Sequence, residues 1–203
     1  MSEAQGVFTC TTHTPLPLQN EGGDWRCFNC LVEEHQAQVY NLCAYLLGDR
    51  ALAEDATQET LLSAYHALSR FRGGNLRAWL LRIAANTCKD MLRAARARPS
   101  LSLEEMTPLE QPLAASGQDS PEESALRREL RQVIRQGLLG LPPEQRMALV
   151  LVDVQGLSYE EAAQAMACNL GTVRSRLSRA RAAMRDYLRH HGELLPSQVR
   201  QDR

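Results

Sequence analysis

The sequence predicts an all-α protein made of two small helical domains that are joined by an irregular linker. Apolar residues recur at helical spacing along residues 27–98 and 121–190, whereas runs that alternate apolar and polar residues, as strands do, are scarce. Ala, Leu and Arg are abundant and aromatic residues make up only 5% of the chain, a composition that favours helices. Between residues 99 and 120, Pro, Ser and acidic residues interrupt the helical pattern, which is typical of a linker.

Two short segments lie outside these blocks. Residues 1–26 lack periodicity and are rich in Thr, Gly and Pro, so we expect a flexible N-terminal extension, and residues 191–203 form a polar C-terminal tail. No run of about 18 apolar residues is long enough to span a membrane, and the first residues do not resemble a secretory signal. A cytoplasmic location without membrane insertion is therefore expected, with the six cysteines as reduced thiols or metal ligands.

The formal net charge of −1 hides a strong local asymmetry. Residues 70–98 contain eight basic side chains against one acid, and residues 171–189 contain six against one, while the acids concentrate at residues 33–59 and 104–129. Two separated basic blocks indicate two contacts with one polyanion.

In the first block, residues 50–68 predict an amphipathic helix. Small and apolar side chains line one side, at Ala53, Ala56, Thr60, Leu61, Ala64 and Leu68. The other side carries Asp55, Gln58, Glu59, Leu62 and His66. An acidic face with an exposed leucine indicates a protein-docking surface, although a solvated surface helix would show the same pattern.

Residues 76–98 predict a second amphipathic helix, which carries one polar stripe. The stripe consists of Arg82, Asn86, Lys89, Arg93 and Arg96. Because arginine and lysine bind phosphates and asparagine can pair with a base edge, we expect nucleic-acid contacts here. The preceding loop, "FRGGN" at residues 71–75, could let the backbone approach a nucleotide closely or could simply turn the chain. Trp79 is expected in the core.

The second block predicts four helices. Ser120, Pro121 and Glu123 are typical of a helix start, and the first helix should end at Gly140. The next should run from the prolines at 142–143 to Gly156. A short helix begins with a second capping box at residues 158–161, and after a tight connection the last helix opens at residue 171. A short capped helix followed by a basic amphipathic helix is typical of a helix-turn-helix.

The last helix should bury one face and present the other to DNA. The apolar positions are Val173, Leu177, Ala180, Met184 and Leu188. The candidate DNA contacts are Thr172, Arg174, Ser175, Arg176, Ser178 and Arg179. The amino-terminal half of a recognition helix enters the major groove, where arginine can read guanine. The alternative is a solvated helix with salt-bridged arginines, which is disfavoured because acids four residues away are almost absent.

Three stretches together resemble the extracytoplasmic-function (ECF) sigma factors of the sigma-70 family. They are "LLGDRALAEDATQETLLSAYHAL", "FRGGNLRAWLLRIAANTCKDMLRAARAR" and "LPPEQRMALVLVDVQGLSYEEAAQAMACNLGTVRSRLSRARAAM". The resemblance implies that residues 27–98 form the region 2 domain and residues 121–190 form the region 4 helix-turn-helix domain. Such a protein has no enzymatic activity, and no Ser-His-Asp, paired-carboxylate or phosphate-loop pattern stands out in this chain.

The resemblance also implies partners for each surface. Asp55, Gln58, Glu59 and Leu62 would dock on the clamp helices of the RNA polymerase largest subunit, and region 4 would meet the polymerase flap. The loop with Phe71, Arg72 and Asn75 and the stripe with Arg82, Asn86, Lys89 and Arg93 would open the minus-ten element. Region 4 would read the minus-thirty-five element. Residues 99–119, if extended, reach about 70 Å, about two turns of DNA. An anti-sigma factor is an expected further partner.

The N-terminal extension contains a possible metal site. Cys10 and His13 are spaced C-x2-H, and Cys27 and Cys30 are spaced C-x2-C. Four such ligands could bind zinc tetrahedrally, although Cys27 and Cys30 could equally be small core residues of the first helix. No other cofactor is expected. Two alternative functions therefore remain: a stand-alone helix-turn-helix regulator, and a sigma factor that senses zinc or thiol oxidation through this cluster.

Overall fold

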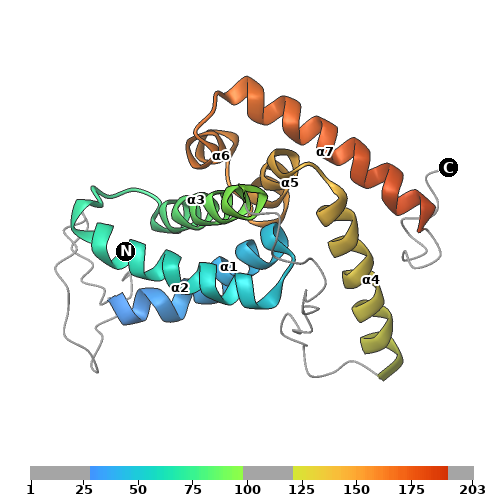
Figure 1. The fold of residues 1–203 in the computed structure, drawn as a ribbon, viewed down its shortest axis with the longest axis horizontal. Helices are drawn as coiled ribbons and strands as arrows, with labels where there is room; N and C mark the ends of the chain where they lie inside the picture. The colour runs from blue at the N-terminus through green and yellow to red at the C-terminus, as the bar shows by residue number, and fades with distance from the viewer. Residues whose placement is uncertain (1–27, 98–120, 192–203) are drawn as a thin grey trace, which may run out of the picture.

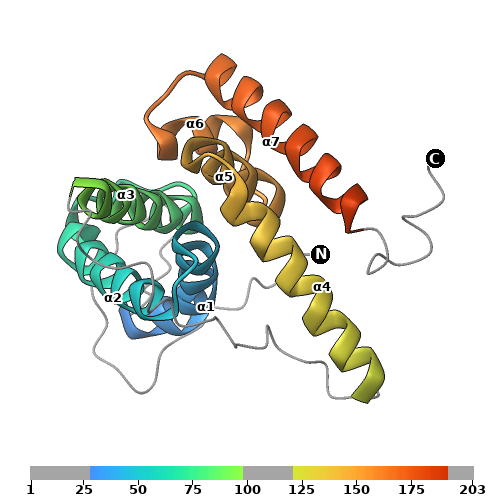
Figure 2. The ribbon, with the colours of Figure 1, turned by 45° about the vertical axis from the view of Figure 1, so that its right-hand side comes forward.

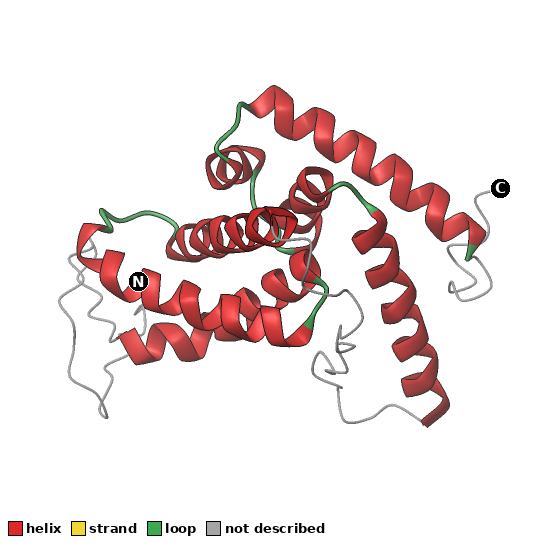
Figure 3. Cartoon of the chain, viewed as in Figure 1, coloured by secondary structure: helices red, strands yellow, loops and turns green. Residues whose placement is uncertain are grey.

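The first domain is a bundle of three helices, α1 (Phe28–Leu47), α2 (Arg50–Ala67) and α3 (Leu76–Ala97). The computed structural model describes residues 28–97 and 121–191, and every regular element within these ranges is helical (Figure 3). The predicted all-α fold class is therefore confirmed. The predicted linker and N-terminal extension lie outside the described residues. No helix in the described part of the chain is both long and apolar enough to cross a bilayer.

A tight turn reverses the chain between α1 and α2. Gly48 adopts a φ of +77°, a left-handed conformation that glycine reaches without a steric penalty. The next residue, Asp49, caps α2 because its carboxylate accepts a hydrogen bond from Leu52 N at 2.8 Å. A single 3-10 turn, η1 (Leu68–Arg70), ends α2 and leads into the loop before α3.

The core of the first domain forms where the three helices meet. Its fully buried side chains include Leu31, Val39, Leu42, Leu46, Leu80 and Leu81. Cys43 of α1 and Cys88 of α3 are also fully buried. The neighbouring Cys43 thiol and the burial together raise the pKa of Cys88 well above its ordinary value. Both cysteines thus act as packing residues of this core.

The second domain contains α4 (Pro121–Gly140), α5 (Pro143–Leu149), α6 (Tyr159–Met166) and α7 (Leu170–His190). The sequence predicted one helix up to residue 156, but α5 ends earlier and continues as a π-helical turn, η3 (Val150–Val154). The wider turn appears as a hydrogen bond from Gln155 N to Val150 O at 2.8 Å. Gly156, with a φ of +67°, then redirects the chain toward α6.

The two domains pack directly against each other. Figures 1 and 2 both show α6 beside α3, and α5 near the carboxyl end of α1. Hydrogen bonds cross this contact. Arg146 Nη1 of α5 donates to Leu46 O at 2.7 Å, and Arg77 Nη2 of α3 donates to Gln155 O. The chain therefore has a closed arrangement, which its sequence did not reveal.

Candidate nucleic-acid interface

The last two helices form a helix-turn-helix whose geometry is set by local hydrogen bonds. Ser158 and Glu161 form the predicted capping box of α6, with distances of 3.1 Å from Glu161 N to Ser158 Oγ and 2.9 Å from Ser158 N to Glu161 Oε2. Ala167 ends α6 in the left-handed region with a φ of 50°. Asn169 then caps α7, which begins at Leu170, one residue earlier than predicted.

The recognition helix α7 has one buried face and one exposed face. The side chains packed into the domain are Val173, Leu177, Ala180 and Met184. The predicted DNA contacts that are exposed are Arg174, Ser175, Ser178 and Arg179. Thr172 is half-buried, and its hydroxyl donates to Asn169 Oδ1 at 2.9 Å. Two arginines and two serines therefore point away from the domain along the amino-terminal half of the helix.

Two other arginines of α7 are held by carboxylates of the second domain. Arg176 Nη1 lies 3.0 Å from Glu144 Oε2 and 3.6 Å from Cys168 Sγ. Arg181 makes a bidentate pair with Asp153 at 2.9 and 2.6 Å, and this hydrogen bonding raises the pKa of its guanidinium. The sequence argument against salt-bridged arginines is wrong at these positions, because the acids come from α5 and η3 rather than from α7.

Among the arginines predicted to contact DNA, Arg176 is held in an ion pair, whereas Arg174 and Arg179 are exposed. The Arg176 side chain is only 25% exposed, so it holds α7 against α5 in this arrangement. Its contact with DNA stays a prediction. Arg174 and Arg179 are exposed, which leaves them as the guanidinium groups best placed to enter a major groove.

Asn169→Ala should lower the free energy of unfolding by about 1 kcal/mol, because the new side chain cannot cap α7. In the wild-type chain, Asn169 Oδ1 accepts from both Thr172 N at 2.7 Å and the Thr172 hydroxyl. Urea denaturation followed by circular dichroism measures the change. Asn169→Asp is the matched control, since aspartate can also cap and should retain most of the stability. Equal stability of Asn169→Ala and the wild type would contradict the role of this cap.

A second basic surface runs along α3. Arg82, Asn86 and Arg93 are exposed and Lys89 is half-buried. Their spacing of three or four residues places these side chains on one face, opposite buried residues such as Ala84. Arg93 pairs with Asp90 at 3.2 Å, but an exposed pair of this kind contributes little free energy. The structure therefore places these four residues of the predicted polar stripe along one face of α3.

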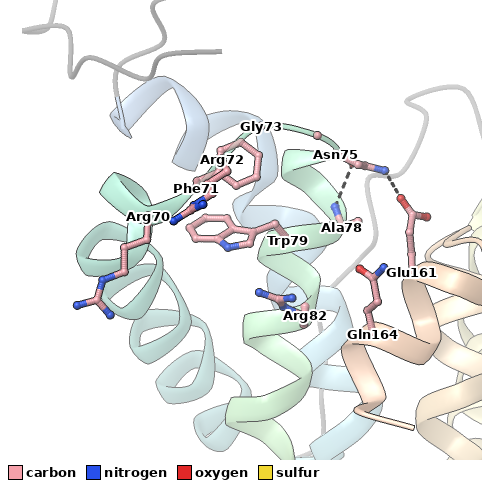
Figure 4. A pocket seen from close by; sticks show the side chains of 11 residues that line it. Arg70, Phe71, Arg72, Gly73, Asn75, Ala78, Trp79, Arg82, Glu161 and Gln164 are labelled. Carbon is pink, nitrogen blue, oxygen red and sulfur yellow. Dashed lines mark hydrogen bonds between the residues drawn. The ribbon is translucent and has the colours of Figure 1, made fainter. Parts of the chain in front are cut away.

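The loop before α3 forms one wall of a cavity of about 470 Å³ (Figure 4). Gly73 and Gly74 have φ values of 92° and 96°, which glycine favours over other residues. The rings of Phe71 and Trp79 lie against each other, with centroids 5.2 Å apart. Trp79, predicted in the core, is half-buried and lines the cavity. The other predicted contacts in the lining are Arg72, Asn75 and Arg82.

The opposite wall of the cavity comes from the second domain. Glu161 and Gln164 of α6 line it, and Asn75 Nδ2 donates to Glu161 Oε1 at 2.6 Å (Figure 4). Asn75 Oδ1 meanwhile accepts from Ala78 N at 3.1 Å and so caps the start of α3. Sequence reasoning missed Glu161 and Gln164 as part of this site, since no local pattern signals a contact between residues 86 positions apart.

The outer face of α2 forms a third surface. Asp55, Gln58 and Glu59 are exposed, and Leu62 has 62% of its surface exposed. Opposite them, Thr60 is fully buried. This arrangement matches the two faces that the sequence predicted for the helix. It leaves an acidic surface with an apolar centre, which is a suitable composition for a protein contact.

The predicted zinc site lies mostly outside the described residues. Cys10, His13 and Cys27 are not described, while Cys30 is half-buried on α1. The described ranges contain no group of three or more His, Cys, Asp or Glu side chains that could hold a metal ion. Zinc binding at Cys10, His13, Cys27 and Cys30 stays a prediction.

Two helical domains with exposed basic faces, one of them a helix-turn-helix, are typical of a DNA-binding protein. The family model described as sigma-70 region 2 matches residues 31–98, and the model described as sigma-70, region 4 matches residues 131–184. Together with sequence relatives that are named ECF sigma factors, these matches confirm the predicted family. The chain belongs to the ECF sigma factors of the sigma-70 family.

The relatives match most of the chain. RNA polymerase sigma-H factor of Pseudomonas aeruginosa is 40% identical over 166 residues, which cover 80% of this chain and 86% of the relative. ECF RNA polymerase sigma-E factor of Escherichia coli is 41% identical over 170 residues, with the same coverage of 80% and 86%. Among solved structures, sigma factor RpoE in complex with anti-sigma factor NepR, from Bartonella quintana, aligns with a TM-score of 0.63 and 27% identity. This alignment covers 80% of this chain and 96% of RpoE.

Proposed function

We propose that this chain is a dissociable, non-catalytic subunit that directs core RNA polymerase to promoters with a minus-thirty-five and a minus-ten element. The observation that carries the proposal is the pair of exposed basic faces, on α3 and α7, in two different domains. A regulator that reads one operator needs only its helix-turn-helix. Two faces of different chemistry suit two dissimilar DNA elements that are recognised together.

Region 4 would read the minus-thirty-five element through α7. The exposed Arg174 and Arg179 can make bidentate hydrogen bonds to guanine or ionic contacts with phosphates. Ser175 and Ser178 add shorter hydroxyl groups on the same exposed surface. The ion pair of Arg181 with Asp153 supports this assignment, because it holds α7 against the turn that precedes α6 while the outer face stays open.

Region 2 would bind and open the minus-ten element. Duplex opening requires a site that compensates for lost base stacking, which amounts to a few kcal/mol for each extruded base. The cavity beside Phe71 and Trp79 offers aromatic surface, and Arg72 and Arg82 add positive charge at its edge. The stripe on α3 would then hold the separated strand by its phosphates.

Asn86→Ala should slow promoter opening at least about tenfold while leaving closed-complex binding within about twofold. Asn86 is exposed in the middle of the basic stripe, and its amide can pair with a base edge, so in the proposed complex its loss should remove a base contact. Permanganate reactivity of unpaired thymines measures opening, and gel mobility shift on ice measures closed-complex binding. Arg93→Ala is the matched control, since loss of a phosphate contact should weaken both steps. Equal losses for Asn86→Ala would contradict base recognition.

Polymerase would bind chiefly through the acidic face of α2. The exposed Leu62 supplies apolar area, while Asp55 and Glu59 supply negative charge for a basic partner surface. Region 4 would make the second polymerase contact, at the flap. An anti-sigma factor is a further proposed partner, because sigma factor RpoE of Bartonella quintana, which has a similar fold, has been solved in complex with the anti-sigma factor NepR.

Mapping transcript 5′ ends after induced expression, in a strain that otherwise lacks the protein, tests the proposal. The expected result is a set of new starts, each preceded by the same two sequence blocks at constant spacing. Existing starts that only change in strength around a palindrome would instead identify a stand-alone helix-turn-helix regulator. Purified chain and core polymerase should reproduce the new starts on linear templates, which separates a direct effect from an indirect one.

A further inference from the structure

Two arginines of the recognition helix lie on either side of its buried face. The buried side chains occupy an arc of about 60° around the axis of α7, at a rotation of about 100° per residue. They are Val173, Leu177, Ala180 and Met184. Arg176 lies about 40° beyond one edge of this arc, and Arg181 lies about 40° beyond the other. The two arginines therefore belong to opposite flanks of the helix, about 7.5 Å apart along its axis.

The carboxylates that bind these arginines come from opposite ends of one segment. Glu144 lies in the first turn of α5, and its Oε2 is 3.0 Å from Arg176 Nη1. Asp153 belongs to η3, which continues α5 directly, and it accepts hydrogen bonds from Arg181 at 2.9 and 2.6 Å. Helix α7 also packs on α5. The α5–η3 segment therefore binds α7 on both flanks as well as through its apolar face.

Both arginines make more than a single flexible surface contact. Arg181 Nε and Nη2 donate to separate oxygens of Asp153, so this pair is bidentate. Most exposed ion pairs contribute little free energy, but bidentate pairs are an exception. The Arg176 guanidinium has a second contact, because its Nη1 lies 3.6 Å from Sγ of Cys168 in the turn before α7. Both guanidinium groups are therefore directed toward their own domain.

The rotation of α7 about its axis decides where its exposed side chains point. Arg174, Ser175, Ser178 and Arg179 lie on the side opposite the buried face. A rotation of about 20° moves a side chain at the helix surface by about 2 Å, since the helix is roughly 10–12 Å across. A hydrogen bond to a base edge requires a donor–acceptor distance of about 2.7–3.2 Å, so this rotation would break it. Attraction between a guanidinium and a phosphate changes less, because it falls slowly with distance.

Apolar packing alone defines this rotation only loosely. The hydrophobic effect is non-directional, and of the buried side chains of α7, Ala180 is small and Met184 is flexible. The two ion pairs are directional, and they act on opposite flanks of the helix. Rotation in either direction moves one arginine away from its carboxylate. The pairs therefore resist rotation in both directions.

We propose that the Arg176–Glu144 and Arg181–Asp153 pairs fix the rotation of α7, so that Glu144 and Asp153 determine promoter specificity without touching DNA. The inference rests on the proposed function, because it assigns positioning residues to the same minus-thirty-five contact. Glu144, Asp153 and Arg181 act through the direction in which the exposed side chains of α7 point. Discrimination between base pairs depends on the ion pairs, whereas general attraction to DNA phosphates does not.

Three substitutions break the pairs without removing a predicted DNA contact. Asp153→Asn and Glu144→Gln each remove a negative charge, and Arg181→Met removes a guanidinium while keeping most of its alkyl chain. The double variant Asp153→Arg/Arg181→Asp restores an ion pair with the charges exchanged. Asp186→Asn is the matched control, because Asp186 is an exposed acid of α7 whose contact with Arg189 is 3.9 Å long. Urea denaturation verifies that every variant is folded under the assay conditions.

The quantity to measure is the preference for a matched promoter. Each full-length variant is assembled with core polymerase, and run-off transcription compares a promoter mapped in vivo with a copy that carries one base-pair substitution in its minus-thirty-five block. The substitution chosen is one that lowers wild-type transcription about tenfold or more, as a mismatched base pair typically does. The three broken-pair variants should lose this preference by a factor of at least about three, and the charge-exchanged variant should regain most of it. The control should keep the wild-type preference.

Other outcomes would overturn the inference. A purely structural role lowers the active fraction of the protein, which reduces transcription from both templates equally and leaves the preference unchanged. A preference that the charge-exchanged variant does not regain would also contradict positioning by the ion pair. A loss confined to Asp153→Asn would assign the effect to a new phosphate contact of the released Arg181, because Arg181→Met cannot make that contact.

Failure of the proposed function gives a different result. In that case the chain does not bind core polymerase, and the mapped sites contain a palindrome instead of two blocks. The same preference, measured by fluorescence anisotropy with the full chain and that operator duplex, still tests the ion pairs, since the recognition helix is unchanged. A wild-type chain without any sequence preference would overturn both proposals.

Discussion

Transcription from promoters of this sigma factor should fall at least about 30-fold when Arg174 and Arg179 are both replaced by alanine. Both guanidinium groups are exposed on the amino-terminal half of α7. Loss of each bidentate base contact costs about 1–3 kcal/mol, so two losses cost about 2 kcal/mol or more, which corresponds to a factor of roughly 30. Run-off transcription with core polymerase measures the decrease, and polymerase binding should remain unchanged.

The control for this pair is Arg189→Ala, which removes a positive charge from the other end of the same helix. Arg189 is 67% exposed and lies 3.9 Å from Asp186, so its loss should leave promoter use within about twofold of wild type. Salt dependence adds a second criterion, because each lost phosphate contact lowers the slope of log affinity against log salt by about 1. Normal promoter use by Arg174→Ala/Arg179→Ala would refute the assignment of α7.

Asp55→Arg should weaken binding to core polymerase at least about tenfold. Asp55 is exposed on the outer face of α2, near Leu62 and Glu59. Replacing its negative charge by a positive one would place the new arginine against the basic polymerase surface that is proposed to bind α2. Such juxtapositions cost several kcal/mol when they are buried at an interface. Fluorescence anisotropy of labelled chain titrated with core polymerase measures the change. Binding to the minus-thirty-five duplex by region 4 should not change.

Glu33→Arg supplies the comparison for this prediction. Glu33 is an exposed acid of the same domain but belongs to α1, so the variant has the same net charge as Asp55→Arg. If both reversals weaken polymerase binding equally, general attraction rather than the α2 face determines the affinity. If neither does, the docking surface has been placed on the wrong helix.

Features set by neighbouring residues were predictable from the sequence. The period of apolar side chains identified the buried face of α7, for example at Leu177, and that of α2 at Thr60. The capping box of Ser158 and Glu161 was also predictable, because both partners lie within one helical turn. Helical spacing likewise predicted that the basic stripe of α3 lies on one face of that helix.

Features that depend on packing between distant segments were not predictable. The partners of Arg176 and Arg181 come from α5 and η3, and no spacing rule connects these residues. Arg146 resembles an ordinary surface arginine in sequence, yet it is buried against a carbonyl 100 positions away. The sequence around each of these residues does not indicate its distant partner. The contact between the two domains was therefore found only in the three-dimensional structure.

The cap that Asn75 makes on α3 has a consequence for base selectivity. Its Oδ1 faces Ala78 N at 3.1 Å, and because an N–H group must be paired with an acceptor, the side chain cannot flip without losing the cap. The Nδ2 group, which donates to Glu161 in this arrangement, is therefore already oriented as a donor. In the proposed minus-ten contact, it could pair with lone pairs such as purine N7, guanine O6 or thymine O4, but not with the exocyclic amines of adenine or cytosine. The proposed contact would thus favour base edges that present an acceptor to the loop.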